Sequence, residues 1–345
     1  MKAVVINAYG GPDVLTCVNN YPDPVAGDDE VVIKVMATSV NPIDAVRRAG
    51  YGHKVFAMRG GADMPLILGH DVSGTVIAKG KDVTRFAIGD EVWSAPDAFR
   101  NGTYAEKVVV RAGEVDFKPE QLNHEEAASL PYVALTTWSA LVKTGAIKPG
   151  QAKGKRVLVH AGSGGVGSFA IQLLKAWGAE VATTCSMKNV EFCKSIGADI
   201  VVDYTREKFE DVLSDMDVVF DTLGYLQNAE KPSLSVLKKG SGAHYVAIVH
   251  PILPWLDESG LPLGMLRVSG AMVSRKLKQG LLYKRKFAWV HFAPDGEALA
   301  VVRKLVDSGR IKPQLHSIMP LEEVARAHEL IESRHTKGKI ILVPK

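Results

Sequence analysis

Residues 157–177 read VLVHAGSGGVGSFAIQLLKAW, a short apolar run that leads into a glycine cluster and then into a helical pattern. Gly162, Gly164 and Gly167 follow the spacing G-x-G-x-x-G, which is weak evidence alone and stronger between a strand and a helix. Apolar side chains then recur at helical spacing, and Gly178 predicts the end of the helix. The segment predicts a loop that holds a pyrophosphate at a helix N-terminus. The alternative is a tight turn without a ligand.

The end of the next strand favours one of the two nicotinamide dinucleotides. An NAD site usually places Asp or Glu there, about 20 residues after the glycines, to bind the ribose 2′-hydroxyl. Here the strand ends in Thr-Thr-Cys-Ser at residues 183–186, followed by Met187 and Lys188, without a carboxylate. The Ser186 hydroxyl and the Lys188 ammonium suit a 2′-phosphate, so we predict NADPH rather than NADH. In the alternative, Ser186 caps the next helix and Lys188 is solvated.

From about residue 155 strands and helices alternate, which predicts a parallel sheet with helices on its faces. The predicted strands are residues 156–161, 180–185, 200–203, 217–221 and 243–249. Before residue 125 the chain has short β-rich runs between Gly, Pro and Asp turns, at residues 31–35, 72–77 and 104–110. That part predicts an antiparallel, barrel-like β domain. The last part predicts helices over 296–308 and 321–333 and a strand over 339–343.

The composition fits two globular domains. The chain has 345 residues, 46% of them hydrophobic, and a net charge of +4 that is spread along the chain, so no nucleic-acid-binding patch is expected. Its three cysteines form no even framework, which favours a reducing compartment. No apolar run reaches the roughly 20 residues of a membrane span. The N-terminus shows no leader pattern, so we expect a cytoplasmic protein, or a mitochondrial one if the chain is a processed form.

A catalytic zinc is not expected. Many two-domain dehydrogenases of this layout hold zinc with Cys and His, but no cysteine lies between Cys17 and Cys185. His70, in Gly69-His70-Asp71, stands where such a motif carries a ligand, and it lacks thiolate partners. We interpret it as a hydrogen-bonded histidine near the start of a strand. No hydrolytic nucleophile motif surrounds the serines of the glycine loop.

Several other stretches resemble the zinc-free quinone oxidoreductases of the medium-chain dehydrogenase superfamily, over nearly the whole chain. They are Asn41-Pro-Ile-Asp44 and residues 47–50, 69–74, 89–93, 128–138 and 338–342, besides the glycine loop. More narrowly, the chain is similar to the reticulon-interacting mitochondrial oxidoreductases. That similarity is most specific at residues 129–136, 169–172, 175–177 and 185–186.

The resemblance implies an α/β fold with a GroES-like β-barrel catalytic domain, residues 1–124 and 288–345, and a Rossmann NADPH-binding domain, residues 125–287, with the site in the cleft between them. It also implies a homodimer through the edge strands of the Rossmann sheets. The cofactor-binding residues that it implies are Thr136, Ser163, Gly164, Gly165, Val166, Gly167, Ser186, Lys188, Tyr204, Thr222 and Lys339. The chain departs from close relatives at Thr222-Leu-Gly224, where they have Asn-Val-Gly, and at His70, where they have Arg.

The chemistry that the resemblance implies is hydride transfer from the nicotinamide to an electron-poor acceptor. Without zinc, hydrogen-bond donors must polarise the acceptor. Asn41 is the first candidate and Tyr51 the second, while Asp44 is expected to orient the local turn. The alternatives are an Asx turn for Asn41, which precedes Pro42, and simple packing for Tyr51.

Three functions are compatible with the sequence. The first is an NADPH-dependent quinone reductase, the second is an NADPH-dependent enone or enal reductase, and the third is a dinucleotide-binding interaction protein with little turnover. The basic segment 275–286, which encloses Gly280-Leu-Leu-Tyr283, is expected to be a solvated helix and loop. Its alternative is a weak contact with an anionic membrane surface.

Overall fold

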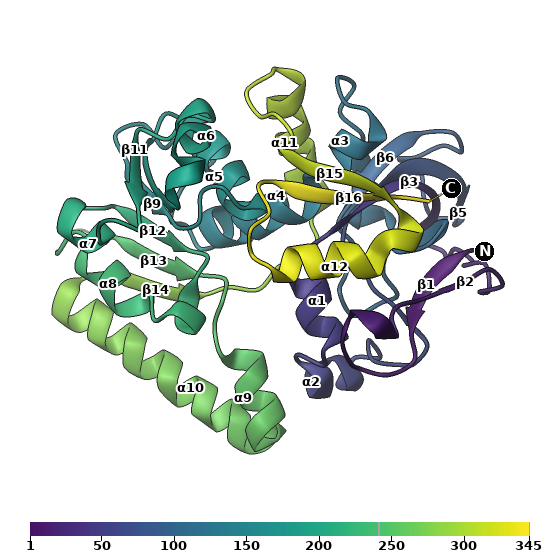
Figure 1. Ribbon diagram of the computed structural model, residues 1–345, viewed down its shortest axis with the longest axis horizontal. Coiled ribbons are helices and arrows are strands. Elements are labelled where there is room, and N and C mark those ends of the chain that lie inside the picture. Colours follow the sequence, from purple (N-terminus) through teal and green to yellow (C-terminus); the bar gives the residue numbers. More distant parts are fainter. Residues whose placement is uncertain (241, 345) are drawn as a thin grey trace. The chain divides into compact units, whose positions relative to one another are not determined.

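The computed structural model describes residues 1–240 and 242–344, and the chain divides into two compact units (Figure 1). Unit 1 comprises residues 1–135, 293–309 and 313–345, and unit 2 comprises residues 136–292 and 310–312. Both ends of the chain therefore belong to unit 1. The functional domain limits predicted from the sequence stay a prediction.

Unit 2 contains a six-stranded sheet in which every neighbouring pair is parallel, in the order β11-β10-β9-β12-β13-β14. The strands are β9 (Arg156–Val159), β10 (Glu180–Cys185), β11 (Ile200–Asp203), β12 (Val218–Asp221), β13 (His244–Ala247) and β14 (Lys286–Trp289). The first five confirm the predicted parallel strands. β14 was not predicted, because its four residues follow a run of basic side chains that is typical of a solvated segment.

Helices cover both faces of this sheet, with α5 and α6 on one side and α8 and α10 on the other in Figure 1. The helices are α5 (Gly165–Ala176), α6 (Val190–Ser195), α7 (Phe209–Val212), α8 (Glu230–Ser235), α9 (Ile252–Ser259) and α10 (Leu261–Leu277), with a π-helical turn, η6 (Lys278–Leu282). Strand residues such as Leu158, Ala182 and Val219 pack in one buried cluster with side chains that follow α8 and with side chains of β14. The sheet is thus buried as a parallel sheet requires.

The basic segment is only partly solvated, which corrects its interpretation from the sequence. Arg285 is 5% exposed and donates to the carbonyl groups of Leu234, Leu237 and Lys238. Arg275 donates to Glu230 at 2.8 Å. These two guanidinium groups attach α10 and the residue before β14 to α8 and the residues that follow it. Among the described residues no helix is both long and apolar enough to cross a bilayer.

Unit 1 contains a seven-stranded sheet in the order β15-β16-β3-β5-β6-β8, with β7 beside β3, and a three-stranded sheet in the order β2-β1-β4. All pairs are antiparallel except β15 with β16. The strands are β1 (Ala3–Ile6), β2 (Thr16–Val18), β3 (Glu30–Val40), β4 (Leu66–Ile67), β5 (Val72–Lys79), β6 (Glu91–Ser94), β7 (Lys107–Arg111), β8 (Val115–Phe117), β15 (Leu315–Pro320) and β16 (Lys339–Val343). The described strand pairs do not form a closed ring, so barrel closure stays a prediction.

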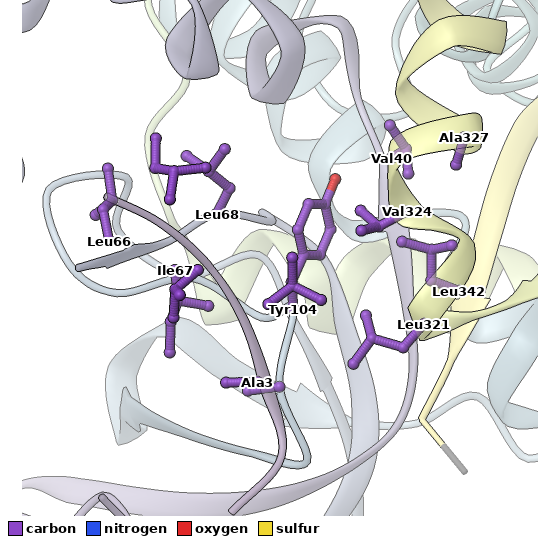
Figure 2. Packing of buried hydrophobic residues seen from close by; sticks show 14 of the residues in the cluster. Ala3, Val40, Leu66, Ile67, Leu68, Tyr104, Leu321, Val324, Ala327 and Leu342 are labelled. Atoms are coloured by element: carbon purple, nitrogen blue, oxygen red, sulfur yellow. The ribbon is translucent and has the colours of Figure 1, made fainter. Parts of the chain in front are cut away.

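The helices of unit 1 lie beside these strands. They are α1 (Pro42–Arg48), α2 (His53–Met58), α3 (His124–Ala127), α11 (Gly296–Asp307) and α12 (Val324–Glu332), and α4 (Pro131–Trp138) runs from unit 1 into unit 2. Figure 2 shows how α12 is held: Val324 and Ala327 pack into a buried cluster with Val40 and Leu342, and the ring of Tyr104 lies in the same cluster. This packing fixes the position of His328, the next residue of α12.

Candidate functional site

The glycine loop of unit 2 is a tight turn at the N-terminus of α5. The Gly162 amide donates to the Thr184 carbonyl at 3.0 Å, and the Gly164 amide donates to the Ala161 carbonyl at 3.0 Å. Gly164 is the N-cap of α5, and Ala161 has a left-handed φ of 51°. A non-glycine residue in that region is uncommon. The predicted loop, with Ser163, Gly165, Val166 and Gly167, therefore lies at the N-terminus of a helix.

The residues predicted for the 2′-phosphate lie together at the ends of β10 and β11. Cys185 and Asp203 end the two strands and pair in register. The residues that follow them, Ser186 and Tyr204, therefore lie at the same edge of the sheet. Lys188 is exposed, and Tyr204 is exposed as well. Ser186 precedes the short helix η4 (Met187–Asn189) without a capping bond from its side chain. Ser186 thus stands at the N-cap position of η4, as the capping alternative expects, but its hydroxyl makes no capping hydrogen bond.

Asn189 connects the two halves of this site and was missed by the sequence analysis. Its Nδ2 donates to the Ser163 hydroxyl at 3.1 Å and lies 3.4 Å from the Ser186 hydroxyl. Asn189 thus joins the glycine loop to the end of β10. Asn189 is the last residue of the short helix η4 and belongs to no motif that would have identified it.

Two other predicted cofactor residues belong to unit 2 but have different surroundings. Thr136, in α4, is buried, and its hydroxyl has no hydrogen-bond partner among residues 1–240 and 242–344. Because buried hydroxyls are nearly always paired, this one is suited to a ligand. Thr222, just after β12, donates its hydroxyl to the His160 carbonyl at 2.8 Å. Its side chain is therefore already engaged within the protein.

Asp71 is the centre of a first buried polar cluster, in unit 1. Its carboxylate accepts from the Ser39 hydroxyl at 2.5 Å, the Asn41 amide at 2.9 Å and the Tyr132 backbone N–H at 2.7 Å. The Lys339 ammonium donates to the same carboxylate at 3.1 Å and to the Asn41 side-chain oxygen. The Asn41 side chain therefore has partners from the residue before β5 and from β16. Asn41 is also the N-cap of α1, in a capping box with Asp44, so the local-turn alternative stays open.

Lys339 differs most from its predicted role. The resemblance implied a contact with the cofactor phosphates, whereas the structure gives its ammonium two acceptors inside unit 1, and the side chain is 6% exposed. A contact with phosphate would have to use the third N–H of the ammonium. Tyr51, the second predicted donor, lies half-buried between α1 and α2.

Asp44 is the centre of a second buried cluster in unit 1. Its carboxylate accepts from the backbone N–H of Asn41 at 2.8 Å and of Gly69 at 3.2 Å, from the Tyr104 hydroxyl at 3.1 Å and from Nδ1 of His70 at 2.5 Å. Burial by itself would raise the pKa of Asp44, but the charge and hydrogen bond of His70, with the further effects of His328 and the Asn41 amide, hold it below its ordinary value. Asp44 therefore orients His70 as well as the turn.

A chain of hydrogen bonds leads from Asp44 to the surface of unit 1. The Tyr104 hydroxyl lies 3.3 Å from Nε2 of His328, whose Nδ1 lies 3.1 Å from the Arg48 guanidinium. Arg48 in turn donates to Glu332 at 2.7 Å. Burial raises the pKa of Tyr104 well above its ordinary value and lowers the pKa of His328 to about 4. His328 is therefore neutral at pH 7 and accepts from Arg48.

The donor set for a zinc ion does not fit. Within residues 1–240 and 242–344 no group of three His, Cys, Asp or Glu side chains is placed to hold a metal ion. His70 has one carboxylate neighbour, Asp44, and that contact uses Nδ1. Independence from zinc itself stays a prediction, which metal analysis of the purified protein tests.

Comparison with known families gives two matches. Residues 27–120 match the alcohol dehydrogenase GroES-like domain, and residues 196–342 match a family described as zinc-binding dehydrogenase. A relative from Danio rerio, "NAD(P)H oxidoreductase RTN4IP1, mitochondrial", is 42% identical over 99% of this chain and 91% of its own. The chain belongs to the medium-chain dehydrogenase/reductase family. The recognition made from its sequence motifs is thus confirmed, and the protein is an NAD(P)H-dependent oxidoreductase.

Other members of the family extend this comparison. The "NADPH-dependent alkenal/one oxidoreductase, chloroplastic" of Arabidopsis thaliana is 33% identical over the whole of this chain and 80% of its own. The quinone oxidoreductase of Coxiella burnetii has a TM-score of 0.82 and 31% identity, with 100% and 99% of the two chains covered. The Escherichia coli quinone oxidoreductase complexed with NADPH has a TM-score of 0.78 and 25% identity over both whole chains. The GroES-like and Rossmann-like parts of the predicted fold are confirmed.

The predicted cytoplasmic location is wrong. The Danio rerio protein and its vertebrate counterparts are named as mitochondrial. The prediction relied on the absence of a leader pattern at residue 1, an observation from which no location follows.

Proposed function

We propose that the oxidoreductase reduces quinones with NADPH and without zinc. The observation that carries the cofactor half of the proposal is the connection that Asn189 makes between Ser163 of the glycine loop and Ser186 at the end of β10. It presents the glycine loop and a hydroxyl-lined ribose position, without a carboxylate at the end of β10 itself, as one surface. When bound there, NADPH supplies a hydride from its nicotinamide ring.

The chain's own residues then bind and orient the cofactor. In this proposal Ser163, Gly164, Gly165, Val166 and Gly167 hold the pyrophosphate. Ser186, Lys188 and Tyr204 surround the 2′-phosphate, and the unpaired Thr136 hydroxyl contacts the nicotinamide. Thr222 and Lys339 are weaker candidates, because both already bind groups of the protein.

The quinone half of the proposal is supported by the family. Two similar solved structures are quinone oxidoreductases, one of them in complex with NADPH. An enone or enal acceptor is the second candidate, and the relative named as an alkenal/one oxidoreductase favours it. Both reactions need the same hydride donor and a hydrogen-bond donor at the acceptor oxygen. We propose Asn41 for that contact, with Tyr51 as the alternative.

A panel of acceptors tests the proposed function. NADPH oxidation is followed with a benzoquinone, a naphthoquinone, a short-chain ubiquinone analogue and two enones, each with an NADH control. We expect faster turnover with quinones than with enones, and with NADPH than with NADH. Enone-selective turnover supports the second candidate. NADPH binding without turnover of any acceptor contradicts both and supports a non-catalytic dinucleotide-binding protein.

The cofactor preference gives a specific prediction for Lys188. Replacing Lys188 with Ala removes the cation proposed for the 2′-phosphate, so we expect KM for NADPH to rise about tenfold, since a charge-assisted hydrogen bond contributes about 1.5–3 kcal/mol. KM for NADH, which lacks that phosphate, is expected to stay the same. Steady-state kinetics with both cofactors measures the difference.

Lys194 provides the matched control for this experiment. It is also an exposed lysine in the segment after β10, and it pairs with Glu191 at 3.0 Å, away from the predicted phosphate position. Lys194→Ala is expected to leave both KM values unchanged. An equal rise for NADPH and NADH in Lys188→Ala contradicts the assignment of the 2′-phosphate.

Two proposals concern larger partners. We propose a homodimer in which the β14 edges of two parallel sheets pair, since β14 is the outer strand of its sheet and has only β13 beside it in the described chain. The alternative of a weak contact with an anionic membrane now depends on Lys276, Lys278, Lys284 and Lys286, because Arg275 and Arg285 bind groups of unit 2.

A further inference from the structure

The imidazole of His70 has one nitrogen bound and one nitrogen buried without a partner among residues 1–240 and 242–344. The side chain is 1% exposed, and Nδ1 lies 2.5 Å from Asp44. Nε2 is equally buried and has no hydrogen-bond partner among the described residues. Because an unpaired buried polar atom costs about 1–3 kcal/mol, such atoms are rare and usually serve a ligand or hold water. Nε2 is therefore a candidate contact for a ligand.

Asp44 binds Nδ1 of His70 and so determines that Nε2 is the nitrogen available to a ligand. Its carboxylate accepts four hydrogen bonds, and the one from His70 places the proton of the imidazole on Nδ1. An imidazole held by a buried carboxylate through one nitrogen, with the other open, is the arrangement of a general acid or base. The carboxylate also stabilises the positive charge of the ring when both nitrogens carry protons.

The neighbouring proton carriers of unit 1 are less suitable for this role. The Tyr104 hydroxyl donates to Asp44, and its raised pKa disfavours release of its proton. The Lys339 ammonium is bound to Asp71 and Asn41. His70 combines a titratable side chain with an unused nitrogen.

We propose that His70, positioned by Asp44, is the proton donor that completes reduction of the acceptor. The inference rests on the proposed function and deepens it. The acceptor gains a hydride, which carries two electrons and is supplied by NADPH, and the nicotinamide is oxidised. The acceptor oxygen gains a proton: its O–H bond forms as the Nε2–H bond of the His70 imidazolium breaks. The imidazole that remains is neutral, keeps its Nδ1–H on Asp44, and takes its next proton from solvent after product release.

A His70→Asn variant tests the proposal against two quinones. The Asn amide nitrogen can replace Nδ1 as the donor to Asp44, but the variant has nothing in place of Nε2. The acceptors are 1,4-benzoquinone, whose hydroquinone is a weak acid and needs protonation, and tetrachloro-1,4-benzoquinone, whose hydroquinone is much more acidic and needs it far less. The ratio of wild-type to variant kcat for each acceptor removes the difference in their intrinsic reactivity.

We expect kcat of His70→Asn to fall about 100-fold with 1,4-benzoquinone, the lower end of what general acid catalysis contributes, and less than tenfold with the tetrachloro compound. The solvent deuterium isotope effect of the wild type is expected to disappear in the variant. Equal losses with both quinones, with the isotope effect unchanged, overturn the proposal and leave His70 a structural residue. Stoichiometric zinc that is lost in His70→Asn also overturns it.

A second readout does not depend on turnover. The protein is labelled with ¹⁵N-histidine and kept free of cofactor. The Nε2 resonance of His70 is assigned by its loss in His70→Asn. It is then followed while 4-methoxyphenol, a hydroquinone analogue, is added. We expect Nε2 to shift and Nδ1 to keep its hydrogen bond to Asp44. An unmoved Nε2 at saturating phenol overturns the proposal whatever the turnover of the variant. If the wild type reduces no acceptor, the proposed function fails, while the Nε2 shift still shows whether the nitrogen meets a ligand.

Discussion

A Gly167→Ala variant is expected to lose about 3 kcal/mol of folding stability, the upper end of the typical cost of overpacking a tight site. A Gly164→Ala variant is expected to keep its stability and to bind NADPH about tenfold or more weakly, because it loses a backbone approach to phosphate that contributes about 1.5–3 kcal/mol. Thermal unfolding measures the first effect, and fluorescence titration with NADPH measures the second.

The two glycines differ in what a Cβ would meet. At Gly167 it would overlap the Ala161 carbonyl oxygen and lie 2.8 Å from the Gly162 Cα. Both neighbours are backbone atoms that cannot rotate away, so α5 would have to move off the end of β9. At Gly164 the nearest atom is the Ala161 oxygen at 3.4 Å, an ordinary contact. The loop therefore accepts an alanine side chain in place of Gly164 without strain, and only an incoming phosphate would meet the new methyl group.

The pair of variants separates a structural turn from a binding loop. If Gly164→Ala binds NADPH as the wild type does, the loop is a tight turn without a ligand, the alternative that the sequence left open. If Gly167→Ala keeps its stability, the packing of α5 against the β9 loop is looser than these contacts indicate. Gly150→Ala cannot serve as a neutral glycine-to-alanine control for these two variants, since Gly150 has a left-handed φ of 71° that strains alanine by itself.

The parallel sheet could be predicted from the sequence because its signals are local. The strand, the glycine loop and the helix of residues 157–177 follow one another without interruption, and each has its own pattern. Four further strands are short apolar runs between turns. β14 was missed because only its pairing with β13, not its composition, makes Lys286–Trp289 a strand.

The clusters of unit 1 could be predicted only in part because their members are distant in the chain. Asn41 and Asp44 stand in a recognisable motif, but the partners that define their roles are Asp71, Lys339 and His70. His328, 280 residues after Arg48, contacts it only because α12 packs on the same apolar cluster as β1 and β16. No spacing in the sequence reports such a contact. The interpretation of His70 as a hydrogen-bonded histidine is therefore confirmed. The sequence could not show that its Nε2 has no partner among the described residues.

Acidification is expected to destabilise both units between pH 6.5 and pH 4. Burial lowers the pKa of His328 in unit 1, and burial with the nearby His291 lowers that of His250 in unit 2, each to about 4. The unfolded chain binds a proton at each position below about pH 6.5 while the folded chain does not, so stability falls as the pH falls through this window. Each lowered pKa corresponds to a loss of roughly 3 kcal/mol by pH 4. Asp44, whose pKa is lowered, adds a loss at still lower pH.

We expect His328→Gln to reduce the pH dependence of the stability of unit 1, and His250→Gln to reduce that of unit 2. Glutamine offers an amide N–H in place of Nε2, which in His328 faces Tyr104 and in His250 donates to the Val290 carbonyl at 3.1 Å, but it does not titrate. Urea unfolding at pH 7 and pH 4.5 measures the change. Circular dichroism follows the whole chain. Tryptophan fluorescence follows mainly unit 2, which contains Trp138, Trp177, Trp255 and Trp289. His335→Gln, at an exposed position, controls for the loss of a histidine as such. If each buried variant loses as much stability between the two pH values as His335→Gln does, the acid sensitivity comes from groups other than His328 and His250, because only a group that binds protons differently in the two states can change the slope.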